Sequence, residues 1–302
     1  MDRKNLIEIN VTSDVGLLRE VVLGPFKPFT MEDLAREAEE DGGAAGDQEE
    51  LLAELLARYC VEAPDPAIGA RQHARLAAVL EEHGVTVHWA DPVDRAVRHY
   101  PRDMGVAVDD VFFLARPATA GRQREQTGLR SLRSRMSRVR ALDAGVIEGG
   151  DVLVSTEEVL VGVGESTSEE GVAALRRAMA EEGLAREVVP LRFAHLGVVH
   201  LDVHFTLAAP GVGLVNPAAF TAESLAQLRS RFDLIEVTAQ EVRALTVNTV
   251  ALGPDRLILQ AGHDRLEAEL ARRGVTPVPV DYSEITRFPG GLHCATLPLV
   301  RI

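Results

Sequence analysis

The sequence has few cysteines, no long apolar run and no excess of basic residues. Only two of its 302 residues are cysteine, Cys60 and Cys294, which gives neither a disulfide framework nor zinc-ligand spacing. No apolar stretch is long enough to span a bilayer, and the amino-terminal residues lack the apolar centre of a signal peptide. We therefore expect a cytoplasmic protein that does not bind membranes.

Charge narrows the choice of partners further. The chain has 32 basic and 46 acidic residues, a net charge of −14, whereas nucleic acids and anionic membranes both require a positive surface. The sequence also lacks a phosphate-binding glycine loop and a dinucleotide fingerprint, so we expect no cofactor and no metal. An acidic protein can still bind a small cation. Nothing in the sequence sets the oligomeric state, for which a homodimer is the commonest arrangement.

What the sequence does contain is a repeated pattern of short β-rich runs that end in turn-forming residues. These runs lie at residues 20–25, 111–117, 159–164, 212–217 and 256–262. The centres of the last four, Phe113, Val161, Leu214 and Ile258, are 48, 53 and 44 residues apart. Such a period predicts a repeat architecture whose units share one core.

Amphipathic helices with capping signals separate these runs. We predict helices over residues 171–183, 222–232 and 263–273, the first opened by Thr167-Ser168-Glu169-Glu170. A further strand, such as 275–280, follows each helix, so the unit is strand, strand, helix, strand.

Residues 31–84 depart from this pattern and are predicted to be a helical insertion. Two or three helical stretches are expected there, over 31–40, 48–61 and 67–83. The glycine-rich residues 41–47 separate the first two of these helical stretches. A surface loop is the simplest interpretation of that break, and a lid over a site is the alternative.

Polar residues recur at one place relative to the repeated strands. Asp103, Asp151 and Asn248 each lie ten residues before a strand centre, and Asp202 lies twelve before the next, with His200 beside it. Equivalent positions in a cyclic repeat point to a common axis. We therefore expect these side chains to converge.

Each motif also has a purely structural interpretation. Arg102-Asp103 could form a surface turn, and Glu148-Gly-Gly-Asp151 could form a hairpin turn. His200 and Asp202 would share one face of a strand by the period-two rule. Cys294, which follows the glycine pair Gly290-Gly291, shifts the balance towards a site, because glycines let the backbone approach a ligand closely.

The chemistry of this set favours a guanidinium ligand. Carboxylates at 103, 148, 151 and 202 need cationic partners if buried, and the only basic residue within these motifs is Arg102. A planar guanidinium can bind two carboxylates, the Cys294 thiolate could attack its central carbon, and His200 could move the proton. Metal binding by the same acids is the alternative, and it leaves the thiol unexplained.

These motifs resemble the guanidino-group-modifying superfamily of arginine deiminases, dimethylarginine hydrolases and amidinotransferases. The resemblance runs from Val11 to Arg301, and its most specific pieces are Pro-Arg102-Asp103, Glu148-Gly-Gly-Asp151, His200-Leu-Asp202, Asn248-Thr-Val-Ala and Gly-Gly-Leu-His293-Cys294. It implies an α/β fold, the five-bladed pseudosymmetric α/β propeller of ββαβ-type repeats, in a single catalytic domain over 1–302.

The resemblance also implies a role for each residue. Cys294 would be the nucleophile of a covalent amidino-cysteine intermediate, and His200 would protonate the leaving amine and then activate water. Glu148 would orient His200 or the substrate, and Asp151 matches the catalytic aspartate of amidinotransferases. The residues expected to bind the substrate are Asp103, Asp202, Arg122, Asn248, Gly291 and His293, of which Arg122 matches an arginine that holds the substrate's tail in deiminases.

Two departures from the family pattern concern the substrate. Deiminases of free arginine carry carboxylate-binding arginines where this chain has Ser166 and Pro289. A guanidino compound with a different tail is therefore as good a candidate as arginine. We predict a hydrolase that acts on C–N bonds of a small cationic guanidino substrate. An amidinotransferase is the first alternative, and a catalytically silent guanidinium-binding protein is the second.

Overall fold

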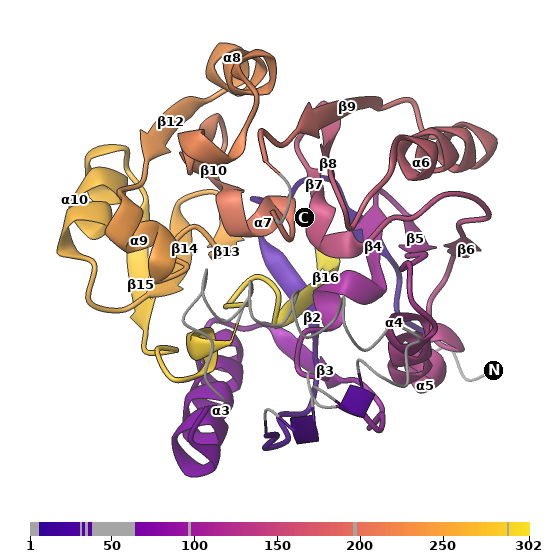
Figure 1. The fold of residues 1–302 in the computed structure, drawn as a ribbon, viewed down its shortest axis with the longest axis horizontal. Helices are drawn as coiled ribbons and strands as arrows, with labels where there is room; N and C mark the ends of the chain where they lie inside the picture. Colours follow the sequence, from indigo (N-terminus) through magenta and orange to yellow (C-terminus); the bar gives the residue numbers. More distant parts are fainter. Residues whose placement is uncertain are drawn as a thin grey trace.

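A computed structural model describes residues 6–30, 32–33, 36–37, 64–95, 98–195, 198–288 and 290–302 of the chain. The fold is mixed α/β, with helices on the outside and small sheets inside them (Figure 1). Within these residues, no helix combines the length and the apolar character that crossing a bilayer requires.

Five sheets make up the interior of the described part of the chain. Four of them have three strands each, in which an antiparallel hairpin is followed by a third strand parallel to the second. These are β4 (Gly105–Val108), β5 (Val111–Leu114) and β6 (Val139–Ala141); β7 (Val152–Val154), β8 (Glu158–Val163) and β9 (Glu187–Arg192); β10 (Phe205–Ala209), β11 (Val212–Val215) and β12 (Asp233–Glu236); and β13 (Val250–Gly253), β14 (Arg256–Gln260) and β15 (Thr276–Val280).

The fifth sheet joins the two ends of the chain. Its strand order is β1 (Asn10–Val11), β16 (Thr296–Arg301), β2 (Leu18–Leu23) and β3 (Thr86–Trp89). Here β16 is antiparallel to β2, and β2 is parallel to β3. The carboxyl-terminal strand thus supplies the first strand of this unit, which brings the nucleophile candidate to the middle of the molecule.

The helices that connect the second and third strands confirm most of the predicted pattern. They are α3 (Pro66–Glu82), α6 (Glu169–Glu181), α8 (Ala222–Arg231) and α10 (Asp264–Arg272), and α4 (Ala120–Glu125) with α5 (Arg130–Arg133) in the remaining unit. Ser168 caps α6 by accepting a hydrogen bond from the backbone of Gly171. Most of the helical stretches predicted at 31–40 and 48–61, together with 41–47 and Cys60, lie outside the described residues.

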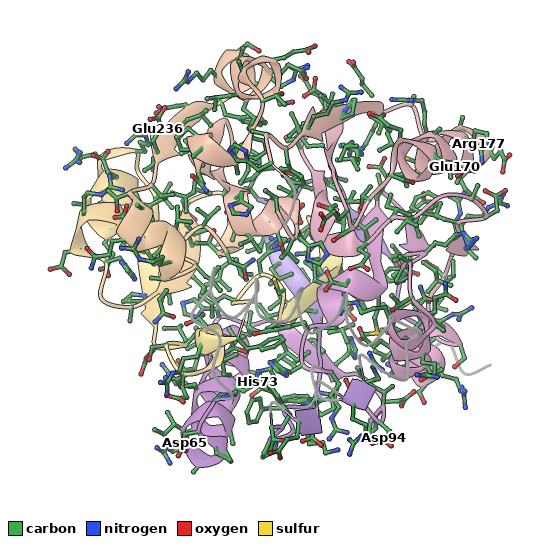
Figure 2. All side chains as sticks on the ribbon, in the orientation of Figure 1. Asp65, His73, Asp94, Glu170, Arg177 and Glu236 are labelled. Carbon is green, nitrogen blue, oxygen red and sulfur yellow. The ribbon has the colours of Figure 1, made fainter. Side chains whose placement is uncertain are left out.

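Burial explains why the inner strands were visible as apolar runs. The side chains of Phe112 and Phe113 on β5 are both fully buried, as are Val159, Leu160 and Val161 on β8. Strands covered on both faces have no polar alternation, and each such aromatic contributes roughly 1.5–3 kcal/mol. The charged residues labelled in Figure 2 on α6 and at the end of β12 lie at the periphery.

A short turn before the first strand of each sheet carries the polar residues of interest. Asp103 lies in the 3₁₀ turn Pro101–Met104 before β4, and Asp151 in the 3₁₀ turn Gly149–Asp151 before β7. Asn248 precedes β13 and Cys294 precedes β16. All four side chains are buried, so neither the surface turn nor the plain hairpin turn describes them.

The strand predicted for His200 and Asp202 is wrong. His200 immediately precedes a one-turn helix, α7 (Leu201–His204), and Asp202 lies within that helix. The backbone N–H of Leu201 donates to Asp151 Oδ1 at 2.9 Å, which fixes the start of the turn. The remaining short helix, α9 (Ala239–Arg243), begins with a capping box between Thr238 and Glu241.

Candidate active site

The turn that carries Cys294 is fixed by a single amide side chain. Asn248 Oδ1 accepts hydrogen bonds from the backbone N–H groups of His293 at 2.8 Å and Cys294 at 3.1 Å. Its Nδ2 donates to Cys294 Sγ at 3.2 Å and to the Asp202 carbonyl at 3.0 Å. A Cβ on Gly291 would lie 2.8 Å from Asn248 Oδ1, so glycine is needed for this approach. The thiol is therefore held in one position.

Burial and neighbouring acidic groups keep the Cys294 thiol protonated. Cys294 is 3% exposed, and its Sγ lies 3.4 Å from Asp202 Oδ2. Burial, together with the charges of Asp202 and Asp103, raises the pKa of the thiol well above its ordinary value. A cation that entered beside these carboxylates would oppose both charges and favour the thiolate.

His200 lies between two carboxylates. Its Nε2 is 2.9 Å from Glu148 Oε2, and its Nδ1 is 3.6 Å from Asp103 Oδ1. Burial opposes a charge on the ring, but Asp103, Glu148 and Asp151 outweigh that effect and raise its pKa to about 10. His200 is thus an imidazolium at neutral pH, which is the protonation state of a general acid.

Arg122, on α4, reaches the same two carboxylates. Its Nη2 lies 2.8 Å from both Asp103 Oδ2 and Glu148 Oε2, and its Nη1 lies 3.2 Å from Glu125 Oε2. Burial favours the neutral form of Glu148, but Arg122 and His200 outweigh it and lower the pKa of this carboxyl to about 2. A guanidinium therefore already occupies the acidic pair.

The Asp151 carboxylate accepts hydrogen bonds from groups that flank the candidate site residues. Its Oδ1 accepts from the N–H of Leu201, and its Oδ2 accepts from the hydroxyl of Thr167 at 2.7 Å. Burial raises the pKa of this carboxyl to about 7, despite the nearby charge of His200. Both oxygens are engaged within the protein, so Asp151 anchors the turn that carries His200 and Asp202.

The donor set fits an organic cation better than a metal ion. Ligand atoms of Asp103, Glu148 and His200 lie within 4.8 Å of one another, so the geometry alone could hold a metal. Protonated His200 has no lone pair to offer, however, and the Arg122 guanidinium bridges the other two ligands. Both features suit a planar cation with N–H donors.

Sequence reasoning did not select Tyr100, which the structure places against the nucleophile turn. Its hydroxyl is buried and has no hydrogen-bond partner within the part of the chain that the structure describes. A Cβ on Gly290, whose φ is +145°, would lie 2.3 Å from the ring, so glycine is required beside the tyrosine. The only indication in the sequence was the position of Tyr100, two residues before Arg102. An aromatic residue at such a position is usually interpreted as part of the hydrophobic core.

Of the two positions that depart from the pattern of free-arginine deiminases, Ser166 is half-buried and contacts the backbone before His200. Ser166 donates through Oγ to the carbonyl of Val199 at 2.8 Å, and so it anchors the chain just before His200. Pro289 lies outside the described residues.

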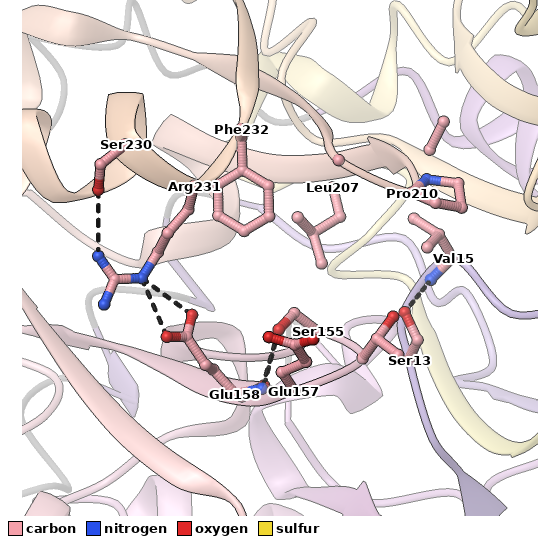
Figure 3. Close-up of a pocket in the computed structure, with 13 residues that line it drawn as sticks. Ser13, Val15, Ser155, Glu157, Glu158, Leu207, Pro210, Ser230, Arg231 and Phe232 are labelled. Carbon is pink, nitrogen blue, oxygen red and sulfur yellow. Dashed lines mark hydrogen bonds and ion pairs between the residues drawn. The ribbon is translucent and has the colours of Figure 1, made fainter.

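A separate cavity of about 430 Å³ lies at the other end of the strands (Figure 3). The turns after β7 and β10 line it, whereas the candidate residues lie before the first residues of those strands. Its principal charged groups are paired, with Arg231 Nε lying 2.9 Å from Glu158 Oε2. None of the candidate catalytic residues is among its described lining residues.

Known proteins resemble the chain in sequence. The family model for arginine deiminase matches residues 91–228. An uncharacterized protein, YkgA, from Bacillus subtilis is 30% identical over 233 residues, which cover 76% of this chain and 79% of the relative. An N(G),N(G)-dimethylarginine dimethylaminohydrolase from Pseudomonas aeruginosa is 26% identical over 243 residues, which cover 78% of this chain and 89% of the relative.

Solved structures resemble it in fold. An amidinotransferase, SxtG, from the saxitoxin biosynthetic pathway of Microseira wollei superposes with a TM-score of 0.79 at 17% identity, covering 97% of both chains. The Pseudomonas aeruginosa dimethylarginine dimethylaminohydrolase, complexed with citrulline, superposes with a TM-score of 0.73 at 19% identity, covering 93% of this chain and 99% of that one.

Proposed function

Because the chain belongs to the guanidino-group-modifying superfamily, we propose that it is a cysteine-dependent hydrolase of a small cationic guanidino compound. One observation carries the proposal. The buried Cys294 thiol lies 3.4 Å from Oδ2 of Asp202, whose Oδ1 is unpaired among the described residues, and Glu148 holds the protonated His200 by a hydrogen bond to Nε2.

Substrate binding follows from an unsatisfied acceptor. Asp202 Oδ1 is buried and has no hydrogen-bond partner among the described residues. An unpaired buried acceptor of this kind costs about 1–3 kcal/mol, or more when charged. A substrate guanidinium N–H would satisfy it, and Asp103 would hold the other side of the guanidinium once Arg122 yields it.

The first chemical step forms the covalent intermediate. The substrate cation favours ionisation of Cys294, whose proton is released to solvent as the substrate binds, and the thiolate then attacks the central guanidinium carbon to form a C–S bond. His200 gives its proton to the departing nitrogen as the C–N bond breaks. Ammonia or an amine leaves, and an amidino-cysteine remains.

Water completes the reaction. His200, now neutral, takes a proton from a water molecule that attacks the amidino carbon. The C–S bond breaks, the thiolate is restored, and a ureido product leaves. Glu148 keeps the imidazole in place through both steps by its hydrogen bond to Nε2. Asp151 and Asn248 would act indirectly, by fixing the turns that carry Asp202 and Cys294.

The residues around the site bear on which tail the guanidino substrate carries. Ser166 bonds to backbone where free-arginine deiminases carry an arginine, and Arg122 lies on Asp103 and Glu148. We therefore propose a guanidino compound that does not depend on a full carboxylate clamp. Dimethylarginine, the substrate named for relatives at 26–27% identity, belongs in the first panel.

Four small sheets with the same internal order, and a fifth that repeats this order in β16, β2 and β3 and adds β1, support a five-bladed α/β propeller within one catalytic domain. The curated relatives named as dimethylaminohydrolases favour hydrolysis over amidino transfer. Amidino transfer is kept as the second function, because the amidinotransferase SxtG shares the fold along 97% of this chain.

A panel of guanidino compounds tests the proposal, with and without acceptor amines. Ammonia or amine release without an acceptor supports hydrolysis, whereas turnover that requires an acceptor identifies a transferase. Cys294→Ser should bind substrate without turnover, and iodoacetamide should inactivate the wild type unless substrate protects it. Cys60→Ser is the control, expected to be active and equally sensitive. Binding without turnover in the wild type, across the whole panel, would indicate a silent guanidinium-binding protein.

A further inference from the structure

A buried chain of polar contacts runs from Asp202 through His293 and Arg102 to Asp14. His293 Nδ1 lies 2.8 Å from Asp202 Oδ2, and His293 Nε2 lies 2.9 Å from Arg102 Nη2. The Arg102 guanidinium in turn lies 3.8 Å from Asp14. Arg102, His293 and Asp202 are 1%, 3% and 0% exposed. Four segments that are far apart in sequence therefore meet in one line that ends at Cys294.

The two contacts of His293 determine where its proton lies. A guanidinium has only donors, so Arg102 can contact Nε2 favourably only if that nitrogen keeps its lone pair. The ring must then be neutral, with its hydrogen on Nδ1, which donates to Asp202 Oδ2. Burial and the charge of Arg102 both lower the pKa of His293, and they outweigh the opposing effect of Asp202. Geometry and charge thus agree on one tautomer.

We propose that Arg102 and His293 form a positioning pair that keeps Asp202 ionised and turned towards the substrate. His293 binds Oδ2 of Asp202, the oxygen that lies 3.4 Å from Cys294 Sγ, and leaves Oδ1 unpaired among the described residues. Because His293 is neutral, it orients the carboxylate without cancelling its charge. This inference rests on the proposed function, in which Asp202 binds a guanidinium, and it moves His293 from a substrate-binding role to a supporting one.

An imidazolium at this position would weaken substrate binding. It would form an ion pair with Asp202 and compete with the substrate cation for the same charge. Arg102 prevents this state, and its other terminal nitrogen, Nη1, lies 3.8 Å from the carboxylate of Asp14. The charged groups that face His293 are Asp202 on α7, Arg102 in the turn before β4 and Asp14 before β2.

The tautomer can be measured without any substrate. In ¹⁵N NMR of histidine-labelled protein, the ring signals lost in His293→Asn identify His293, and their coupling pattern shows which nitrogen carries hydrogen. We expect a neutral ring protonated on Nδ1 in the wild type. Hydrogen on Nε2, or on both nitrogens at pH 7, would overturn the inference whatever the substrate proves to be.

Substitutions then test the effect on Asp202. The Asn amide of His293→Asn can occupy the place of Nδ1 and donate to Asp202, whereas His293→Leu cannot. With methylguanidine as the probe, on a Cys294→Ser background, we expect binding within about threefold of the parent for Asn and at least about tenfold weaker for Leu. Equal affinity for the Leu variant and the parent would contradict the positioning role.

Arg102 is tested by its pH profile. In Arg102→Met the restraint on His293 is gone, so the pKa of His293 rises and the ring protonates as the pH falls. KM should then rise more steeply between pH 8 and pH 6 than in the wild type, while kcat changes less, and Arg102→Lys should restore the wild-type profile. A purely structural role predicts lower thermal stability with a parallel loss of kcat in both variants.

The two proposals fail in distinguishable ways. If the wild type binds no guanidino probe and Asp202→Asn changes nothing, the proposed function fails, and the NMR result on His293 still stands alone. If the wild type binds the probe and the His293 and Arg102 variants match it at every pH, only the positioning pair is disproved.

Discussion

Arg122 donates to Asp103 across 2.8 Å, so a carboxylate proposed to receive a guanidinium substrate already holds a guanidinium of the protein. The same nitrogen lies 2.8 Å from Glu148. A substrate therefore has to compete with Arg122 for Asp103, or else bind with Arg122 displaced towards Glu125, whose carboxylate already lies 3.2 Å from Nη1. This competition distinguishes small cations from substrates with an anionic tail.

Replacing Arg122 with Gln should separate those two classes of ligand. Methylguanidine has no tail and should bind more tightly, by about threefold to tenfold, because its competitor is gone. Arginine should gain less or lose affinity, since a displaced Arg122 can pair with its carboxylate. Calorimetry on the Cys294→Ser background measures both, and Arg130→Gln is the control. Weaker binding of methylguanidine would show that Arg122 holds the site together instead.

His200 gives the protein a pH dependence with a defined sign. Its pKa is about 10 in the folded protein against 6.5 ordinarily, so its charge stabilises the fold fully below pH 6.5, and the contribution is lost as the pH rises through about 10. The free energy of unfolding should fall over that window by at most about 1.4 kcal/mol per pH unit. Urea denaturation of the wild type and His200→Gln isolates the effect. Parallel curves for the two proteins would contradict it.

Asn248→Ala should slow the chemistry of the thiol. The Asn248 donor lowers the pKa of Cys294, so its loss raises that pKa and leaves less thiolate at any given pH. The N–H groups of His293 and Cys294 also lose their acceptor, at a cost of about 1–3 kcal/mol each in unfolding free energy. Iodoacetamide alkylation rates at pH 8 measure the first effect. Asn216→Ala, which removes only a turn cap and a contact to His204, should leave the alkylation rate unchanged.

Gly150→Ala should harm activity more than folding. The new Cβ would lie 2.7 Å from Asp103 Oδ1 and 2.9 Å from His200 Cγ, so both side chains must shift. Displacements near 1 Å cost up to about a hundredfold in rate. Gly253→Ala meets nothing closer than 3.5 Å and is the matched control. An active Gly150→Ala enzyme with wild-type kcat would show that the positions of Asp103 and His200 do not limit the reaction.

Much of the fold could be predicted because its elements leave local signals. Strands such as β5 and β8 are buried on both faces and therefore appear in the sequence as apolar runs. The capping residue Ser168 indicates where α6 begins. The error at His200-Leu-Asp202 has a physical cause. Two polar residues that are two positions apart are compatible with a strand and with a helical turn. The hydrogen bond from the Leu201 N–H to Asp151, a residue 50 positions away, favours the helical turn here.

The sequence by itself determined which residues belong together. The repeat period placed Asp103, Asp151, Asp202 and Asn248 at equivalent points, and the glycine pair singled out Cys294. Only the tertiary structure decided what each contacts: Arg122 lies on Asp103, Asp151 anchors a backbone turn, and His293 stands behind Asp202. Spacing along a chain sets which segments meet, whereas the direction and protonation of a side chain depend on partners from distant segments.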